Sequence, residues 1–430
     1  MSKNIVILFD GTSNEIAADR TNILRLFGVL KRSSTQIVYY DPGVGTFGAA
    51  NAWSRAYRKS IEVWGLATGW GLDQNVKEAY RFIVDNYEHA PRGSGEDSDR
   101  IHIFGFSRGA YSARVLAGFI HALGIVSRHH VNLIDYAYRT YKGISDNEAK
   151  AGGFAGPTDD DAPSAFSSMR LYERTLKTYR PKIKLLGLFD TVASVIEMGK
   201  WVPQLRTLPF TRKNPSIEWV RHAMAIDERR TMFNPMPWTP GQEYWGGPFR
   251  PKEPVPQNVK EVWFAGVHGD IGGGYPEKES GIIKIPLEWM ISETRQTGLD
   301  YIDQTVKAVV LGDNSRPIQN YVAPNAQANP HYSMTAGWRL LEYVPRRVPE
   351  TSWRKRGNAE GIYLPLQDRR FIPDGAVIHQ SVIDRGNLSP NLPRQGNFTI
   401  EPWSDRPPAK DGPHHPPAKD GPDHPPPAQF

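Results

Sequence analysis

The segment from residue 101 to 123 joins a strand to a helix through a turn of very few residues. Ile101–Phe106 (IHIFGF) is an apolar run typical of a buried strand, and Ala110–Leu123 has a strongly helical pattern. Gly105-Phe106-Ser107-Arg108-Gly109 stands at their junction. Because a strand followed directly by a helix is the unit from which parallel sheets are built, this segment constrains the chain to an α/β arrangement.

The same alternation of strand and helix patterns extends over the first 300 residues. Further strands are predicted at Ile5–Phe9, Gln36–Tyr40, Ile183–Phe189 and Val259–Phe264. Helices are predicted from Thr21 or Asn22 to Lys31, over Leu72–Tyr87 and over about Ala165–Tyr179. Strands that alternate with helices favour a mostly parallel sheet with helices on both faces. We therefore predict the α/β class, with one domain over residues 1–300.

Several stretches depart from this pattern. Residues 143–164, rich in Gly, Asp and Pro, and residues 201–256, rich in Trp, Pro and Arg, are interpreted as insertions that cover or shape a pocket. Residues 301–402 are expected to be a C-terminal extension that packs on the first domain. Residues 403–430 repeat PPAKDGP almost verbatim, and so proline-rich a segment cannot bury a core. We predict a disordered tail there.

Composition narrows the chemistry that the chain can perform. The absence of cysteine excludes disulfides, thiol catalysis and cysteine-ligated metals. The net charge of +6 is spread along 430 residues, so no nucleic-acid partner is expected. The glycine-rich PGVGT and GDIGGGY lack the end of a phosphate-binding loop, and we expect neither a cofactor nor a metal. No run predicts a transmembrane segment or a secretory signal, so synthesis in the cytoplasm is expected.

Ser107 is the predicted nucleophile. In a GxSxG turn between strand and helix, the sharp bend holds the serine hydroxyl out at the edge of the sheet. The N-terminus of the following helix directs N–H groups toward a developing oxyanion, so the Arg108 N–H is one expected donor. The N–H of Gly11 or Thr12, after the first strand, is the second, although this segment can equally be an ordinary turn. The alternative for Ser107 is a serine that only caps the helix.

A serine nucleophile needs a base, and the base needs an acid that orients it. Asp190 follows the run KLLGLF and His268 follows VWFAGV, so both come where a strand is predicted to end. Ser, then Asp, then His is also the order in which hydrolases of this topology carry the three groups. Asp190 can instead cap a helix starting near Thr191, and His268 can be a structural histidine. His379, in VIHQSVIDR, is the rival base.

Three further polar residues are assigned to the wall of the predicted site. Asp10 and Asp270 follow the first and the last of the predicted strands. His222 is interpreted as part of a helix, where it either contacts substrate or pairs with Asp227.

Several separated motifs, taken in order, resemble a known family. They are FDGTSNE, TNI, YYDPGVGT, GFSRGAYSAR, GLFDTVAS, HAMAIDERR and VWFAGVHGDIGGGY. Together they are similar to the catalytic domain of the first family of bacterial type VI secretion lipase effectors, an α/β-hydrolase-like domain that also occurs in fungal relatives. The resemblance covers roughly residues 3–300, with a weaker echo at VIHQSVIDR. The chain is short, and the resemblance does not extend to a large separate membrane-anchoring domain.

The resemblance implies an α/β-hydrolase fold and a phospholipase that acts through an acyl-enzyme on Ser107, with Asp190 as acid and His268 or His379 as base. It also implies a phospholipid or other lipid ester as substrate, a secretion spike or an immunity protein as partner, peripheral contact with a membrane, and delivery into the periplasm of a target cell. Two alternatives stay open. One is an esterase or thioesterase for small soluble substrates, and the other is a non-catalytic binding module with a hydrolase-like fold.

Overall fold

The computed structural model of the chain describes residues 2–11, 19–43, 70–90, 97–144, 165–192, 195–198, 203–313, 315, 320–347, 362–386, 389–393 and 396–403. Thr12, most of the predicted insertion at 143–164 and the predicted tail after residue 403 lie outside these ranges. The described part forms an α/β fold around one eight-stranded sheet, with strand order β14-β13-β10-β7-β4-β3-β1-β2. Every neighbouring pair in this sheet is parallel, as the alternation of patterns predicts.

The strands of the main sheet are β1 (Asn4–Phe9), β2 (Gln36–Asp41), β3 (Arg100–Phe106), β4 (Lys182–Phe189), β7 (Ile217–Ala225), β10 (Asn258–Phe264), β13 (Ala376–His379) and β14 (Phe398–Glu401). Short antiparallel pairs are formed by β5 (Val195–Met198) with β6 (Pro203–Arg206), β8 (Glu243–Tyr244) with β9 (Val255–Pro256), and β11 (Arg346–Arg347) with β12 (Ile362–Tyr363). The strand order reverses between β1 and β3, and in open α/β sheets such a reversal opens a crevice at the carboxyl ends of the strands.

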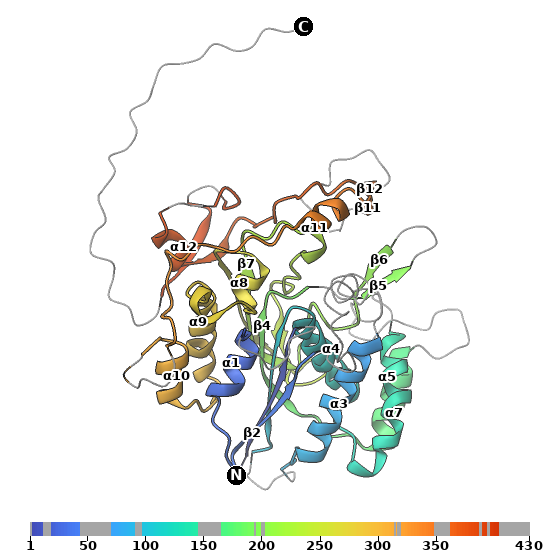
Figure 1. Ribbon diagram of the computed structural model, residues 1–430. Helices are drawn as coiled ribbons and strands as arrows, with labels where there is room; N and C mark the ends of the chain where they lie inside the picture. The colour runs from blue at the N-terminus through green and yellow to red at the C-terminus, as the bar shows by residue number, and fades with distance from the viewer. Residues whose placement is uncertain are drawn as a thin grey trace, which may run out of the picture.

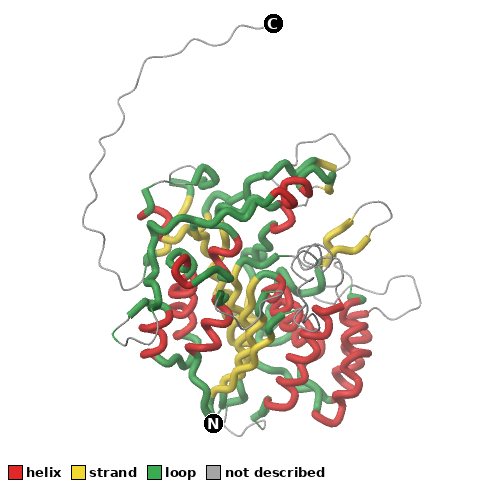
Figure 2. Tube along the Cα trace, in the orientation of Figure 1, coloured by secondary structure: helices red, strands yellow, loops and turns green. Residues whose placement is uncertain are grey.

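Helices cover both faces of the sheet, which stands as a single layer between them (Figures 1 and 2). One face carries α3 (Trp70–Asn86), α4 (Arg108–Leu123), α5 (Ile134–Lys142) and α7 (Ala165–Leu176). The other face carries α1 (Asn22–Val29), α9 (Lys284–Arg295) and α10 (Asp303–Val309). The remaining helices are short: α8 (His268–Gly272), α11 (Ala336–Leu341), α12 (Gln380–Asp384), and the 3-10 turns η1 (Arg128–Leu133), η2 (Thr231–Phe233) and η3 (Glu277–Glu279).

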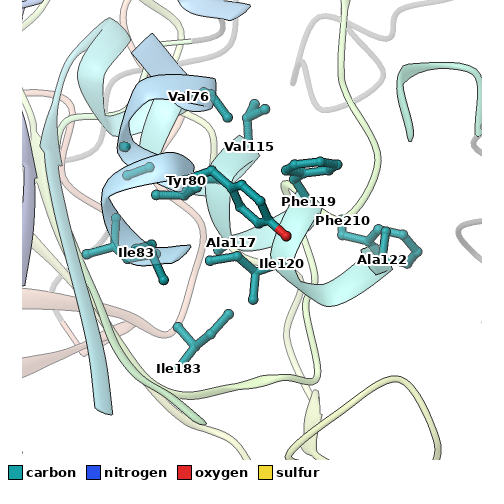
Figure 3. Close-up of a cluster of buried hydrophobic side chains, with 14 of the residues drawn as sticks. Val76, Tyr80, Ile83, Val115, Ala117, Phe119, Ile120, Ala122, Ile183 and Phe210 are labelled. Carbon is teal, nitrogen blue, oxygen red and sulfur yellow. The ribbon is translucent and has the colours of Figure 1, made fainter. Parts of the chain in front are cut away.

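The sheet separates two hydrophobic cores, and this explains the unbroken apolar run of β1. Ile5 and Ile7 belong to the core under α3 and α4, whereas Val6 and Leu8 belong to the core under α1 and α9. A strand covered by helices on both faces needs apolar residues at every position rather than at alternate ones. Figure 3 shows the first core, where Tyr80 of α3 lies against Phe119 of α4 with ring centroids 4.8 Å apart.

Two predictions about the course of the chain are wrong. The stretch 201–256 is not an insertion throughout, because its residues 217–225 form β7 in the middle of the sheet. This strand is hidden in the sequence by two polar residues. Arg221 forms an ion pair with Glu293 (2.7 Å), and His222, whose pKa is lowered by burial, is hydrogen-bonded to Glu261 (2.8 Å). A buried polar group with a partner is stable, but an apolar pattern cannot reveal it.

The residues after position 300 also do more than pack on a finished domain. They supply β13 and β14, which extend the same sheet beyond β10. Trp403, the first residue of the predicted tail, belongs to the packed structure, since its indole N–H donates to Glu288 (2.9 Å). Among the described helices, none combines the length and the apolar character needed to cross a bilayer.

Candidate active site

Ser107 occupies a strained turn between β3 and α4. Its backbone angles are φ 59° and ψ −121°, a region that residues other than glycine rarely adopt. Such strain persists only where surrounding structure enforces it, and it concentrates at functional sites. The serine hydroxyl makes no capping bond to α4, so the interpretation of Ser107 as a simple helix cap is wrong.

The two glycines of the GxSxG motif allow the close packing on which this turn depends. A Cβ atom on Gly105 would lie 2.4 Å from the carbonyl oxygen of Gly109. A Cβ atom on Gly109 would lie 2.4 Å from the carbonyl oxygens of Phe9 and Asp10 at the end of β1. Both distances are too short for any side chain, so only glycine lets α4 start this close to β3 and β1.

Ser107, His268 and Asp190 form a continuous line of hydrogen bonds. His268, the first residue of α8 after β10, has its Nε2 2.8 Å from Ser107 Oγ and its Nδ1 2.5 Å from Asp190 Oδ2. Asp190 follows β4 directly and is completely buried. Because parallel strands end at one edge of the sheet, residues that follow β3, β4 and β10 meet there, although Ser107 and His268 are 161 positions apart in the sequence.

The charges in this line favour a neutral histidine next to an ionised aspartate. Burial raises the pKa of Asp190, but the Arg370 guanidinium and the contact with His268 outweigh burial and hold this pKa below its ordinary value. Burial lowers the pKa of His268 below its ordinary value, and the bond to Asp190 opposes this only in part. With Nδ1–H donated to Asp190, Nε2 is left to accept the proton of Ser107.

A second carboxylate fixes the backbone of the loop that carries His268. Glu228 accepts a hydrogen bond from the His268 backbone N–H at 3.1 Å and forms an ion pair with Arg230 at 2.8 Å. The Ser333 hydroxyl donates to the same carboxylate at 3.0 Å. Burial raises the pKa of Glu228, yet the bonds from Arg230 outweigh it and lower this pKa to about 2. Glu228 is therefore an ionised anchor for the loop.

Aromatic rings pack around the imidazole of His268. Phe106 lies on one side, with ring centroids 4.8 Å apart, and Phe233 lies at 4.9 Å in an edge contact. Trp338 of α11 packs against Phe233 at 5.4 Å, so α11 is linked to the histidine through one ring. These apolar contacts exclude water from the histidine and fix its orientation.

One of the backbone N–H groups predicted to bind the oxyanion is already engaged in a hydrogen bond within the protein. The Gly11 N–H donates to its neighbour's carboxylate, Asp10 Oδ1, at 2.6 Å, so it is not a free donor for an oxyanion. Asp10 itself is buried and also accepts from Thr21 (2.5 Å) and Tyr40 (2.8 Å). It therefore braces the end of β1 rather than lining the site. Arg108 is the first residue of α4, directly after Ser107.

The other predicted wall residues brace the fold. His222 lies on β7 and not on a helix; it is fully buried, pairs with Glu261 rather than with Asp227, and accepts from the Thr191 N–H at 3.3 Å. Asp270 is also fully buried, where it accepts from the Val267 N–H at 2.8 Å and pairs with His331 at 2.5 Å. This pairing raises the pKa of His331.

His379, the rival base, lies at the end of β13. Its Nδ1 is 2.8 Å from the Ser381 hydroxyl, and its ring stacks on Phe264 with centroids 4.7 Å apart. It also caps α12 by accepting from the Ser381 N–H. The histidine within hydrogen-bond distance of Ser107 Oγ is His268, and the contacts of His379 are those of a structural residue.

Sequence reasoning missed the groups that surround the line of three residues. Glu228 and Arg230 belong to HAMAIDERR, one of the motifs that carry the family resemblance, but the sequence does not indicate what either residue does. Arg370 donates to both oxygens of Asp190, yet it lies in the weakly patterned region after residue 300. An isolated arginine in such a region gives no sign of its partner.

Comparisons with known proteins place the chain in a family. The family model "T6SS, Phospholipase effector Tle1-like, catalytic domain" matches residues 3–293. An uncharacterized protein of Saccharomyces cerevisiae, YEL023C, is 33% identical over 251 residues, which cover 55% of this chain and 34% of the yeast protein. This chain thus spans about a third of the length of that relative.

Two solved structures show weaker similarity. An uncharacterized protein from Pseudomonas aeruginosa is 18% identical with a TM-score of 0.37, over 70% of this chain and 46% of that one. A Tle1 effector, solved bound to the VgrG spike of the type VI secretion system, is 19% identical with a TM-score of 0.24, over 64% of this chain and 51% of that one.

Proposed function

The chain belongs to the family of Tle1-like phospholipase effectors of type VI secretion, and we propose that it is a serine hydrolase that cleaves acyl ester bonds of phospholipids. The observation that carries this proposal is the line of hydrogen bonds from Ser107 Oγ through His268 to Asp190, at 2.8 and 2.5 Å. A strained serine, a neutral base and an ionised acid in this order are the parts that acyl transfer to a serine requires.

In the proposed mechanism, Ser107 Oγ attacks the ester carbonyl while His268 Nε2 takes the hydroxyl proton. Asp190 holds the Nδ1–H and stabilises the imidazolium that forms. The Arg108 N–H, at the start of α4, donates to the oxyanion. His268 then gives its proton to the departing alkoxide, which leaves as the lysophospholipid. A water molecule, deprotonated by His268, attacks the acyl-enzyme, and the fatty acid is released as Ser107 regains its proton.

Exposed apolar side chains near α11 support a lipid rather than a small soluble ester as substrate. Leu340, Tyr343 and Val344 are exposed at the end of α11. Leu364 and Leu366 lie beside them, because the Leu366 N–H donates to the carbonyl of Glu342. Through Trp338 and Phe233 this surface reaches His268. Apolar side chains gathered next to a site are typical of a surface that contacts a partner or a membrane.

Product analysis on vesicles tests the proposal. Vesicles of phosphatidylethanolamine and phosphatidylglycerol are expected to yield equal amounts of fatty acid and lysophospholipid, detected by mass spectrometry. A monomeric short-chain ester in solution is expected to be a poorer substrate than the vesicles. Release of a phosphorylated head group would contradict acyl ester cleavage, and a preference for the monomeric ester would favour the small soluble substrate instead.

The apolar surface provides a variant for the same experiment. Leu340→Ser is expected to lower the rate on vesicles by about 5- to 20-fold, the value of one leucine contact with lipid, and to leave the monomeric ester unaffected. Leu171→Ser on α7 is the matched control, since Leu340 and Leu171 are 73% and 61% exposed but α7 lies on one face of the sheet, away from α11 (Figure 1). Equal effects of the two changes would exclude a lipid-contacting role for α11.

We also propose that the protein is delivered by a type VI secretion spike into the periplasm of a target bacterium, where it acts against that cell. The family to which the chain belongs is one of secreted effectors, and this supports the proposal. An effector that degrades phospholipids also threatens the cell that makes it, so a matching immunity protein is expected as a second partner. Co-purification of the full chain with the spike protein of its own cell is the test.

A further inference from the structure

Asp190 forms an ion pair with an arginine that lies outside the region matched by the family model. Arg370 lies 77 residues beyond the end of the match at residue 293, shortly before β13. Its guanidinium donates to both oxygens of Asp190, through Nη1 to Oδ1 at 2.6 Å and through Nη2 to Oδ2 at 2.9 Å. Arg370 is buried, and it also donates to the carbonyls of Ala225 and Phe233. The C-terminal region therefore reaches into the centre of the site.

These bonds complete the coordination of the Asp190 carboxylate. Oδ1 accepts from the Ala225 N–H (3.0 Å) and from Arg370, and Oδ2 accepts from Arg370 and His268. A carboxylate offers about four acceptor positions, so none is left over and the group cannot rotate without breaking a bond. A planar guanidinium that binds both oxygens fixes the plane of the carboxylate more firmly than a single donor does.

We propose that Arg370 is a positioning residue for the hydrolysis reaction, which holds Asp190 ionised and oriented so that His268 keeps its Nδ1 proton and presents Nε2 to Ser107. This inference rests on the proposed function, because it assigns a role in the same reaction. It makes the C-terminal region part of the catalytic machinery rather than a cover for it.

A positioning role for Arg370 affects the pH dependence of hydrolysis, whereas a purely structural role leaves it unchanged. Arg370 places a positive charge against both oxygens of Asp190, and this charge opposes protonation of the His268–Asp190 pair. The other charged groups around the His268 loop are Glu228, its partner Arg230, and the Asp270–His331 pair. Arg370→Gln changes none of these side chains, so the titration of His268 compares the protein with and without the charge of Arg370.

The charge of Arg370 determines the direction in which the pKa of His268 changes. His268 must be neutral to act as a base, so activity falls as the pH drops through its pKa. Removing the positive charge of Arg370 lets the His268–Asp190 pair bind a proton more readily, which raises the pKa of His268. In Arg370→Gln the acidic limb of kcat/KM is therefore expected to move to higher pH. The maximal kcat is expected to fall by about 100-fold, less than the roughly 10⁴-fold known for loss of an orienting acid.

The experiment compares four forms of the full chain: wild type, Arg370→Gln, Arg370→Lys and Arg25→Gln. Arg25 is the matched control, because it is also buried and binds a carboxylate, Glu277, at 3.1 Å without contact to Asp190 or His268. Arg370→Lys is expected to keep the acidic limb of the wild type, since the charge remains, but to lose kcat because lysine cannot bind both oxygens. Arg25→Gln is expected to lower the melting temperature and leave the limb unmoved.

A second measurement does not depend on turnover. In protein labelled with ¹⁵N-histidine, the His268 signals, assigned by their loss in His268→Gln, report its tautomer and its pKa. Arg370→Gln is expected to raise that pKa and to weaken the preference for the Nδ1–H form. If wild type fails to hydrolyse any ester, the proposed function fails, and the titration still tests the contact of Arg370.

The outcomes that overturn the inference are distinct from that failure. In an active wild type, an unmoved acidic limb and an unmoved His268 pKa in folded Arg370→Gln would reduce Arg370 to a structural residue. If Arg370→Gln does not fold, Arg370→Lys decides: full wild-type kcat in that variant would refute the need for a two-oxygen contact.

Discussion

Ser107→Ala is expected to lose ester hydrolysis by on the order of 10⁴-fold or more in kcat, as other serine triads do when the nucleophile is removed. The hydroxyl is the attacking group, and no other side chain takes its place next to His268 Nε2 in the described structure. The fold is expected to stay intact, because the hydroxyl makes no bond to the helix that it precedes. Steady-state kinetics on a soluble ester and a thermal melt measure both properties.

Ser112→Ala is the control for this change. Ser112 is a buried serine of α4, five positions after Ser107 in the same motif, and it is expected to be dispensable for turnover. Retention of even a tenth of the wild-type rate in purified Ser107→Ala would refute the serine mechanism.

His268→Asn is expected to lose nearly as much kcat as Ser107→Ala, because asparagine cannot take the proton of the serine. Triad members act as a unit, so the double variant Ser107→Ala, His268→Asn is expected to lose little more than either single one. Single-turnover and steady-state rates on the same soluble ester measure the loss. Additive losses would show that the two side chains work separately.

His379→Ala is the control histidine for that experiment. It is expected to keep kcat and to lower the free energy of unfolding by about 1–3 kcal/mol, because its ring caps α12 and stacks on Phe264. A folded but inactive His379→Ala, together with an active His268→Asn, would transfer the role of base to His379.

The sequence predicts the sheet well where apolar residues report burial. β1, β3 and β4 are covered by helices on both faces, so each appears as an apolar run, interrupted only by His102 in β3 and Lys184 in β4. β7 occupies an equally central position but carries Arg221 and His222, which find partners inside the fold in Glu293 and Glu261. Such pairing is a property of the folded state, and no periodicity in the sequence contains it.

The residues of the site also divide into those that a local sequence pattern reveals and those that only the folded structure reveals. Ser107 and Asp190 come directly after a strand and His268 follows one within four residues, so local patterns suffice to select them, and parallel strands bring their ends to one edge. The partners of these residues come from distant segments without a pattern: Arg370 reaches Asp190 across 180 residues and Ser333 reaches Glu228 across 105. The sequence predicts Gly11 as a turn residue, but only the folded structure shows that its N–H donates to Asp10.

Covalent trapping of the nucleophile tests the central claim most directly. A fluorophosphonate reacts with a serine only when a neighbouring base has activated its hydroxyl, and the adduct can be located by mass spectrometry of peptides. Wild type is predicted to carry one adduct, on Ser107, while Ser107→Ala carries none and His268→Asn reacts far more slowly. An adduct on another residue, or a folded wild type that hydrolyses esters while Ser107 stays unmodified, would contradict the account.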